Sequence, residues 1–225
     1  MRDRPDTLML FAAGRGTRMA PLTNHLPKPM VRVADKPLID HALRLALEAG
    51  ISRIVINTHY LPQPLNTHLA KKDVQIIHEP DLLETGGGLR NALPLLGDKP
   101  VLTLNSDAVW RGNPIPDLLD GWQNGEMDAL LCLIQPQNAL GHSGPGDFLL
   151  SETGRLRRGA GAIYSGLQVI DTSYLHEIPD KVFSLNAVWD IIARDGKLFG
   201  QIHDDLWCDV GRPESIALAE SMIGV

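Results

Sequence analysis

The sequence has few cysteines and no long apolar run, and each shortage excludes a class of protein. Its 225 residues contain two cysteines, Cys132 and Cys208, which are too few for a disulfide framework or a thiolate metal site. We expect both to be small buried residues. The apolar runs are too short to span a membrane, and the first six residues lack the apolar stretch of a signal peptide. We therefore expect a cytoplasmic protein without a membrane partner.

Positive charge is also scarce. The chain has 21 lysines and arginines against 27 aspartates and glutamates, which gives a formal net charge of −6. A general nucleic-acid binder usually needs a basic surface, so nucleic acid is not an expected partner. If the protein binds phosphate, it must concentrate positive charge at one local site. The sequence leaves the oligomeric state open.

Short apolar runs alternate with amphipathic segments in the first half, as in a doubly wound α/β domain. Central parallel strands buried on both faces are predicted at 8–12, 53–57, 74–78 and 101–105. Helices that cover the crossovers are predicted at 38–49, 65–70 and 88–96.

The second half is less regular, and we expect a mixed sheet edge there. Strands are predicted at 129–134, 162–169 and 198–202, a hairpin at 148–157, and helices at 184–194 and 213–222. No repeat or polar linker divides the chain. The sequence therefore predicts a single Rossmann-like α/β domain over residues 1–225, with a mixed, mostly parallel sheet flanked by helices.

The segment after the first predicted strand is suited to binding phosphates. Its residues are Ala12, Ala13, Gly14, Arg15, Gly16, Thr17 and Arg18. The two glycines let backbone amides approach an anion, while the threonine adds a hydroxyl donor and the arginines add charge. The glycine pair alone could be a strand-ending turn or the start of a dinucleotide fingerprint. Met19 at the third glycine position and four prolines between residues 21 and 37 disfavour the dinucleotide fingerprint, and the spacing does not match the usual NTPase loop.

Two prolines flank Lys28 shortly downstream. Because each proline restricts its own φ and disfavours helix in the residue before it, we expect Lys28 on a stiff extended segment that can direct its ammonium group. An ordinary surface lysine is the alternative, but the nearby glycine and arginine loop favours a functional role. The segment G-x-G-T-R-M-x-P-L-T followed by P-K-P resembles the signature of the nucleoside-diphosphate-sugar pyrophosphorylases, a family of sugar-1-phosphate nucleotidyltransferases.

Two later features extend this resemblance. The run Glu84, Thr85, Gly86, Gly87, Gly88 follows the third predicted strand and resembles the glycine loop of the family that lies against the nucleobase. A flexible turn is the alternative for three glycines. Glu79 falls where family members place a polar residue that reads the base. A carboxylate can accept from the ring N–H of uracil, or from the ring N–H and amine of guanine, so the sequence leaves the base open between those two.

Two aspartates are candidate metal ligands. Asn105 and Asp107 lie at the end of the fourth predicted strand, where open α/β sheets bind ligands, and Asp209 follows a later apolar run. Either aspartate could instead cap a neighbouring turn or helix. The resemblance implies that Asp107 and Asp209 bind Mg²⁺, with water and phosphate oxygens as the other ligands. Asn105 is a candidate substrate contact.

The acceptor site is expected at the turn just before the predicted hairpin at 148–157. Gly146 and Asp147 lie in a turn suited to accept hydrogen bonds from sugar hydroxyls, although a plain turn is the alternative. Ser165 and Gly166 are expected to line the same pocket. Within the family, these features most resemble the N-acetylmuramate-1-phosphate uridylyltransferases. The chain departs from many relatives at Ala20, where they carry a second basic residue, and at Ser106, where they carry glycine.

The resemblance implies transfer of a nucleotidyl group, with UTP favoured, to a sugar 1-phosphate, with N-acetylmuramic acid 1-phosphate favoured, and release of pyrophosphate. Lys28 is assigned to the reacting phosphates and Arg18 to the leaving pyrophosphate. No general base is needed, because the attacking phosphate oxygen is already ionised. The alternatives are a guanylyltransferase acting on mannose 1-phosphate or another hexose 1-phosphate, a dinucleotide-dependent oxidoreductase, and a noncatalytic sugar-nucleotide sensor.

Overall fold

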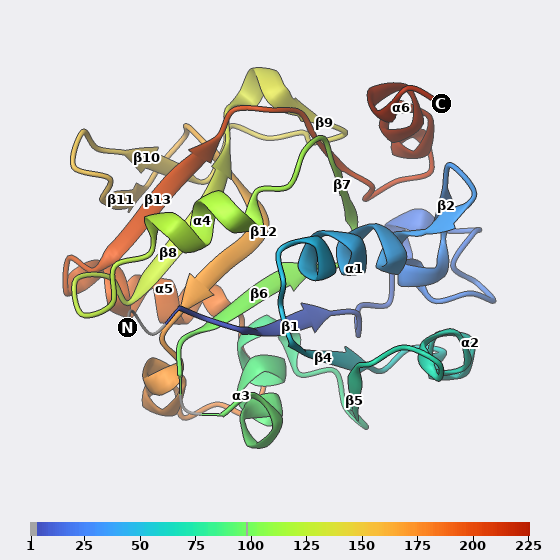
Figure 1. Cartoon of the computed structure of the whole chain (residues 1–225), viewed down its shortest axis with the longest axis horizontal. Coiled ribbons are helices and arrows are strands. Elements are labelled where there is room, and N and C mark those ends of the chain that lie inside the picture. Colours follow the sequence, from blue (N-terminus) through green and yellow to red (C-terminus); the bar gives the residue numbers. More distant parts are fainter. Residues whose placement is uncertain (1–3, 98) are drawn as a thin grey trace.

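A mixed seven-stranded sheet crosses the computed structural model, which describes residues 4–97 and 99–225 (Figure 1). Its strand order is β13-β8-β12-β6-β1-β4-β5. The strands are β1 (Thr7–Phe11), β4 (Arg53–Thr58), β5 (Gln75–His78), β6 (Val101–Asn105), β8 (Ala129–Ile134), β12 (Ile163–Ile170) and β13 (Leu198–His203). β12 runs antiparallel to both of its neighbours, while the other neighbouring pairs are parallel. The structure confirms the predicted mixed, mostly parallel sheet flanked by helices.

Helices cover both faces of this sheet. In Figure 1, α1 and α4 lie in front of the strands. The helices are α1 (Leu38–Glu48), α2 (Pro62–Leu69), α3 (Glu84–Leu96), α4 (Ile115–Gly121), α5 (Leu185–Arg194) and α6 (Glu214–Ile223). Buried residues of α1, α2 and α4 form one hydrophobic cluster with the sheet, and those of α3 and α5 form another. The fold therefore has three layers.

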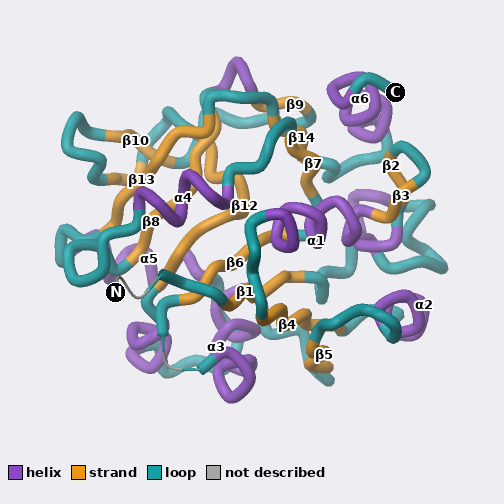
Figure 2. The backbone as a smooth tube through the Cα atoms, viewed as in Figure 1, coloured by secondary structure: helices purple, strands orange, loops and turns teal. Residues whose placement is uncertain are grey.

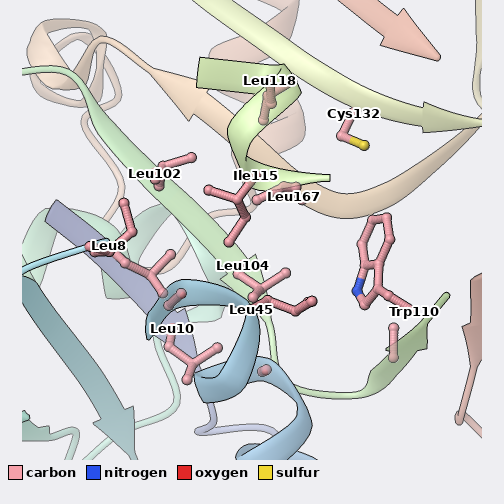
Figure 3. Packing of buried hydrophobic residues seen from close by; sticks show 14 of the residues in the cluster. Leu8, Leu10, Leu45, Leu102, Leu104, Trp110, Ile115, Leu118, Cys132 and Leu167 are labelled. Atoms are coloured by element: carbon pink, nitrogen blue, oxygen red, sulfur yellow. The ribbon is translucent and has the colours of Figure 1, made fainter. Parts of the chain in front are cut away.

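The side-chain alternation of the central strand explains the two clusters. Leu8 and Leu10 of β1 belong to the cluster under α1 and α4, whereas Met9 between them belongs to the cluster under α3. Figure 3 shows Leu8 and Leu10 beside leucines of β6 and near Ile115 of α4. All three β1 side chains are fully buried. A continuous apolar run is therefore what a central strand with helices on both faces requires.

Short elements form the rim beyond the carboxyl ends of the parallel strands. β7 (Ala108–Trp110), β9 (Ala139–Leu140) and β14 (Trp207–Asp209) pair into a small sheet, which lies toward α6 in Figure 2. The other pairs are β2 (Arg32–Val33) with β3 (Lys36–Pro37) and β10 (Phe148–Leu150) with β11 (Leu156–Arg158). The 3-10 helices are η1 (Thr17–Met19), η2 (Lys28–Met30), η3 (Pro136–Asn138) and η4 (Thr172–Glu177).

The structure corrects two expectations about the sheet. β5 is an edge strand with mostly exposed residues, not a strand buried on both faces. Its run of isoleucines and valine looks apolar in sequence, but it has a neighbour on one side only. The antiparallel strand β12 lies inside the sheet between β8 and β6, and the edge beyond it is β13, which runs parallel to β8.

Two other expectations concern the cysteines and the membrane. Cys132 and Cys208 are both buried free thiols, as predicted. In residues 4–97 and 99–225, every helix is too short or too polar to cross a bilayer.

His41 on α1 holds the β2–β3 hairpin against the helix. Its ring nitrogen Nε2 donates to the Val33 carbonyl oxygen at 3.0 Å, and the residue is 8% exposed. Burial lowers the pKa of His41 below its ordinary value of 6.5, and the positive charges of Arg44 and Lys36 add to this effect. The folded state therefore resists protonation at a pH where the unfolded chain accepts the proton.

We expect acidification to reduce stability through His41. Because the unfolded state binds more protons, this contribution is fully present above the ordinary pKa and is lost as the pH falls below it. Between about pH 7.5 and about pH 5.5, the loss from this group is at most about 1.4 kcal/mol. Urea unfolding of the wild type and of His41→Phe at both pH values measures it, because the variant should show a smaller pH dependence. Equal pH dependence in the two proteins would contradict the assignment.

Candidate active site

Strand pairing brings the two predicted metal ligands together. Asp107 follows β6, and Asp209 ends β14, which pairs antiparallel with β7 so that Asp209 lies opposite Ala108. The backbone N–H of Val210 donates to the Asp107 carbonyl oxygen at 2.9 Å. The small sheet on the rim therefore places side by side two carboxylates that are far apart in sequence.

The charges around this pair fit a divalent cation. Burial raises the pKa of Asp209, and the negative charge of Asp107 raises it further, while Lys28 and Arg18 act in the opposite direction. Lys28 Nζ lies 2.7 Å from Asp107 Oδ2, and its side chain is 11% exposed. The described residues contain no cluster of three carboxylate, imidazole or thiolate ligands. Two carboxylates suit an ion such as Mg²⁺, which keeps several waters and binds substrate phosphates.

The loop after β1 leaves backbone N–H groups free. Gly16 has a left-handed φ of 63°, and a side chain there would meet Lys28 Cβ at 2.8 Å. The Gly16 carbonyl oxygen accepts from the Met19 N–H and the Thr23 hydroxyl. Among the described residues, the N–H groups of Gly14 and Arg15 have no protein acceptor. Gly14, Arg15, Thr17 and Arg18 are exposed, as expected of an anion-binding loop.

The conformation around Lys28 differs from the extended segment that the prolines predict. Pro27 is extended, but Lys28 begins the 3-10 turn η2, because the Met30 and Val31 N–H groups donate back to the Pro27 and Lys28 carbonyl oxygens. The proline after Lys28 is tolerated at the start of this turn, where no N–H is required. The lysine is thus directed at Asp107 by a tight turn and by contact with Gly16.

A first cavity of about 380 Å³ opens beside this cluster. Eight of the predicted site residues line it, namely Ala12, Ala13, Gly14, Lys28, Glu79, Thr85, Asn105 and Asp107. Ser106 also lines it, and its hydroxyl donates to the Phe11 carbonyl oxygen at 2.6 Å, so this departure from glycine is accommodated by a hydrogen bond. The cavity joins the phosphate loop to the ends of β1, β4, β5 and β6.

Glu79 lines this cavity with a side chain that is packed into the wall. It is fully buried, and its two carboxylate oxygens accept from Asn57 Nδ2 at 2.8 Å and from the Leu83 N–H at 3.3 Å. Asn57 Oδ1 in turn accepts from the Ala12 N–H at 2.8 Å. Both oxygens thus bind protein groups in the wall, and a role of Glu79 in reading the base stays a prediction.

The predicted glycine loop is instead the first turns of α3, which begins at Glu84. The N–H groups of Gly86 and Gly87 donate to the Phe183 carbonyl oxygen at 2.9 and 3.0 Å. A side chain on Gly86 would lie 2.4 Å from the Phe183 ring, and one on Gly88 would lie 2.8 Å from Glu79 Oε1. These glycines allow close packing, and the amides of Gly86 and Gly87 bind protein rather than facing an empty pocket.

A second cavity of about 510 Å³ shares a wall with the first. Phe11, Thr85, Asn105 and Ser184 line both cavities, while Arg18 and Asp147 line the second. Asp147 is exposed, and its Oδ2 accepts from the Tyr164 N–H at 2.8 Å. Gly146 has φ 91°, and a side chain there would overlap the Gly161 carbonyl. The expected acceptor residue Asp147 therefore lies in a cavity that adjoins the one lined by Asp107.

Ser165 and Gly166 lie inside the sheet behind this cavity. Ser165 is 2% exposed, and its hydroxyl donates to the Cys132 carbonyl oxygen at 2.7 Å. Gly166 has φ 87° within the irregular part of β12, and a side chain there would lie 2.8 Å from Asn105 Nδ2. The structure thus corrects their expected place on the pocket surface: both are buried in the sheet, and the glycine makes room for the Asn105 side chain.

Sequence reasoning missed several residues that line these cavities: Asn57, Arg158, Ser184, Asn186 and Trp189. Glu84, which the sequence indicated only as part of the glycine run, is an exposed carboxylate on the wall of the first cavity, with an unusual left-handed φ of 60°. The others come from the ends of β4 and β11 and from the start of α5. They carry no motif, so only the folded arrangement identifies them.

Comparison with known proteins agrees with this arrangement. A family model described as nucleotidyl transferase matches residues 7–140. The chain is 36% identical to the N-acetylmuramate alpha-1-phosphate uridylyltransferase of Caulobacter vibrioides over 99% of both chains, and 33% identical to that of Neisseria meningitidis over 96% and 97%. It is 25% identical to a mannose-1-phosphate guanyltransferase of Xenopus laevis, covering 92% of this chain and 61% of the relative.

Solved structures share the fold at low sequence identity. A Bacillus anthracis protein provisionally assigned as a glucose-1-phosphate thymidylyltransferase matches with a TM-score of 0.83 and 14% identity, over 96% of this chain and 94% of that one. At this identity, the match concerns the architecture of the sheet and helices alone.

We expect Asn57→Ala to weaken both the fold and the first cavity. The change leaves the Ala12 N–H and one oxygen of buried Glu79 without partners, which should lower the free energy of unfolding by about 2–4 kcal/mol. The looser Ala12 backbone should also raise the KM of the nucleotide. Asn138→Ala is a matched control, because Asn138 makes one exposed hydrogen bond, to Asp204. Urea unfolding and steady-state kinetics test this, and a variant no less stable than the control would contradict it.

Proposed function

The chain belongs to the nucleotidyl transferase family, and we propose that it transfers the uridylyl group of UTP to N-acetylmuramic acid 1-phosphate and releases pyrophosphate. Sugar-1-phosphate uridylyl transfer is the activity in the names of the two relatives that cover nearly the whole chain. The protein is therefore a nucleotidyl-transferring enzyme. Its reactants are a nucleoside triphosphate and a sugar phosphate.

The observation that carries the proposal is the charged cluster between the two cavities. Asp107 lines the first cavity, and Arg18 lines the second. Both affect the pKa of Asp209, which the charge of Asp107 raises and that of Arg18 lowers. A triphosphate and a sugar phosphate repel each other, so an enzyme that joins them must neutralise and align them at one place. A cluster of two cations and two metal-binding carboxylates between two adjoining cavities is suited to this.

The first cavity is assigned to the nucleotide and the second to the sugar phosphate. The free N–H groups of the loop after β1 would bind the triphosphate, and Asp147 would accept hydrogen bonds from sugar hydroxyls. The sugar-phosphate oxygen forms a bond to the α-phosphorus, and the bond from that phosphorus to the pyrophosphate oxygen breaks. Lys28 would offset charge on the reacting phosphates, and Arg18 would bind the leaving pyrophosphate.

Transferases of this family generally use a divalent metal ion, and we assign it as Mg²⁺ held by Asp107 and Asp209. When bound, the ion supplies positive charge to the phosphate oxygens. The raised pKa of Asp209 supports this assignment, since burial beside a second carboxylate favours a nearby cation. Lys28 holds Asp107 in place at 2.7 Å.

The relatives favour uridine over guanosine. The mannose-1-phosphate guanyltransferase is more distant, at 25% identity, and this chain spans less than two thirds of it. A dinucleotide-dependent oxidoreductase is not supported, because the family match includes the glycine loop on which that alternative rested. A noncatalytic sensor would have less need of Arg18, Lys28 and both aspartates together. Uridylyl transfer to the muramic acid derivative is therefore the proposed reaction.

We expect Asp107→Asn and Asp209→Asn to reduce turnover by about 10²-fold or more at limiting Mg²⁺, because each removes an anionic metal ligand while roughly preserving shape. Both variants should need more Mg²⁺ for half-maximal rate, and a chelator should abolish wild-type activity. Asp73→Asn, at an exposed aspartate on another part of the surface, is the control. Near wild-type turnover of both site variants would remove these residues from the metal site.

The substrate assignment is tested by a pyrophosphate-release screen. UTP, dTTP and GTP are each combined with the 1-phosphates of N-acetylmuramic acid, N-acetylglucosamine and mannose. We expect the highest kcat/KM for UTP with N-acetylmuramic acid 1-phosphate. A preference for GTP with mannose 1-phosphate would overturn the substrates but leave nucleotidyl transfer in place. Absence of pyrophosphate release with every pair would overturn the enzyme assignment.

A further inference from the structure

The second cavity contains a cation for which the proposed reaction gives no role. Arg18 and Arg158 both line this cavity, and they come from different parts of the chain. Arg18 belongs to the loop after β1, and its positive charge lowers the pKa of Asp209. It therefore lies close to the proposed metal and phosphate site. Arg158 ends β11 and contacts the start of α5 instead. A sugar 1-phosphate without a further acidic group has one anionic group, its phosphate, and the proposed reaction already assigns Lys28 to it.

Arg158 is held in place by contacts that leave much of its guanidinium free. Its Nε donates to Asp190 Oδ1 at 3.0 Å, and its Nη2 donates to the Asn186 carbonyl oxygen at 3.1 Å. The guanidinium carbon lies 4.8 Å from the centre of the Phe148 ring and 5.4 Å from that of Trp189. A guanidinium has five N–H donors, so three remain available. The aromatic contacts fix its plane before any ligand binds.

The ion pair with Asp190 leaves Arg158 able to bind a second anion. The two side chains are 41% and 61% exposed, and an ion pair between such exposed groups contributes little to stability. The planar edge of a positioned guanidinium suits a carboxylate, to which it can donate two parallel hydrogen bonds. Asp147, the other charged side chain on this part of the wall, already accepts from the Tyr164 N–H. Arg158 is therefore available to a ligand carboxylate.

We propose that Arg158 binds the carboxylate of the lactyl ether on N-acetylmuramic acid 1-phosphate and thereby selects this acceptor over N-acetylglucosamine 1-phosphate. The two sugars differ by that ether, which adds a second anionic group away from the phosphate. Lys28, which is assigned to the reacting phosphates, and Arg158 come from separate elements, and this suits two separated anions on one acceptor. This assignment rests on the proposed function and extends it to the residue that recognises the acceptor.

Product inhibition tests the assignment without depending on turnover of a poor substrate. The inhibition constants of UDP-N-acetylmuramic acid and UDP-N-acetylglucosamine are measured against UTP for the wild type and for Arg158→Gln. We expect the variant to raise the constant of the muramic product about 10-fold or more, since a charged hydrogen bond is lost. The constant of the glucosamine product should change less than about 2-fold. The KM of N-acetylmuramic acid 1-phosphate should rise in parallel.

Two further variants separate recognition from packing. Arg155→Gln is the matched control, because Arg155 also stacks on a phenylalanine, Phe199, and donates to a carbonyl oxygen, that of Gly196, but does not line the cavity. It should leave both inhibition constants unchanged. Arg158→Lys keeps the charge without the planar edge, so its effect on the muramic product should lie between those of the wild type and Arg158→Gln.

The outcomes distinguish this assignment from the function on which it rests. Equal changes for both products, or no change for either, would overturn the role of Arg158 while uridylyl transfer stands. A wild type that forms no UDP-N-acetylmuramic acid from UTP and the sugar phosphate would overturn the proposed substrates, and the assignment with them. A large change confined to the muramic product, absent in Arg155→Gln, supports it.

Discussion

The site depends on holding two carboxylates together against their mutual repulsion. Asp107 and Asp209 raise each other's energy when both are ionised, and burial raises the cost further, as the elevated pKa of Asp209 shows. The β7–β14 pairing supplies the restraint, because Asp209 lies opposite Ala108 and the Val210 N–H binds the Asp107 carbonyl oxygen. Lys28 offsets part of the charge at 2.7 Å. Two carboxylates held together in this way attract a cation.

The position of Lys28 explains the long, proline-rich loop before α1. The loop must carry a lysine from the surface to a nearly buried place beside Asp107, and it must still present free amides to an anion. Gly16 meets both needs, since it adopts a left-handed φ and lies against the Lys28 side chain where no other residue fits. Through Lys28, the loop after β1 and the Asp107 side chain therefore form one packed unit.

The sequence predicted the elements and residues whose role is local. The strands around Leu8 and Leu102, the helix 38–49 and the phosphate loop follow from apolar runs and from glycine and proline chemistry. The sequence-based prediction was wrong or incomplete where contacts with residues far away in the chain determine the local structure. Gly86 looks like a loop residue in the sequence, but it lies in α3, and its N–H donates to the Phe183 carbonyl oxygen. Arg158 has no motif, because its place depends on rings and a helix that come from elsewhere in the chain.

The same long-range contacts give the two cavities a common wall. The Phe183 carbonyl oxygen accepts from the first amides of α3, and the Leu185 N–H donates to the Thr85 hydroxyl at 3.0 Å. Thr85 and Ser184, on either side of this junction, line both cavities. A shift of α3 that widened the first cavity would therefore move the start of α5, which carries Trp189 and the carbonyl that holds Arg158. One set of hydrogen bonds positions both walls, and the fold itself therefore sets how the two cavities lie relative to each other.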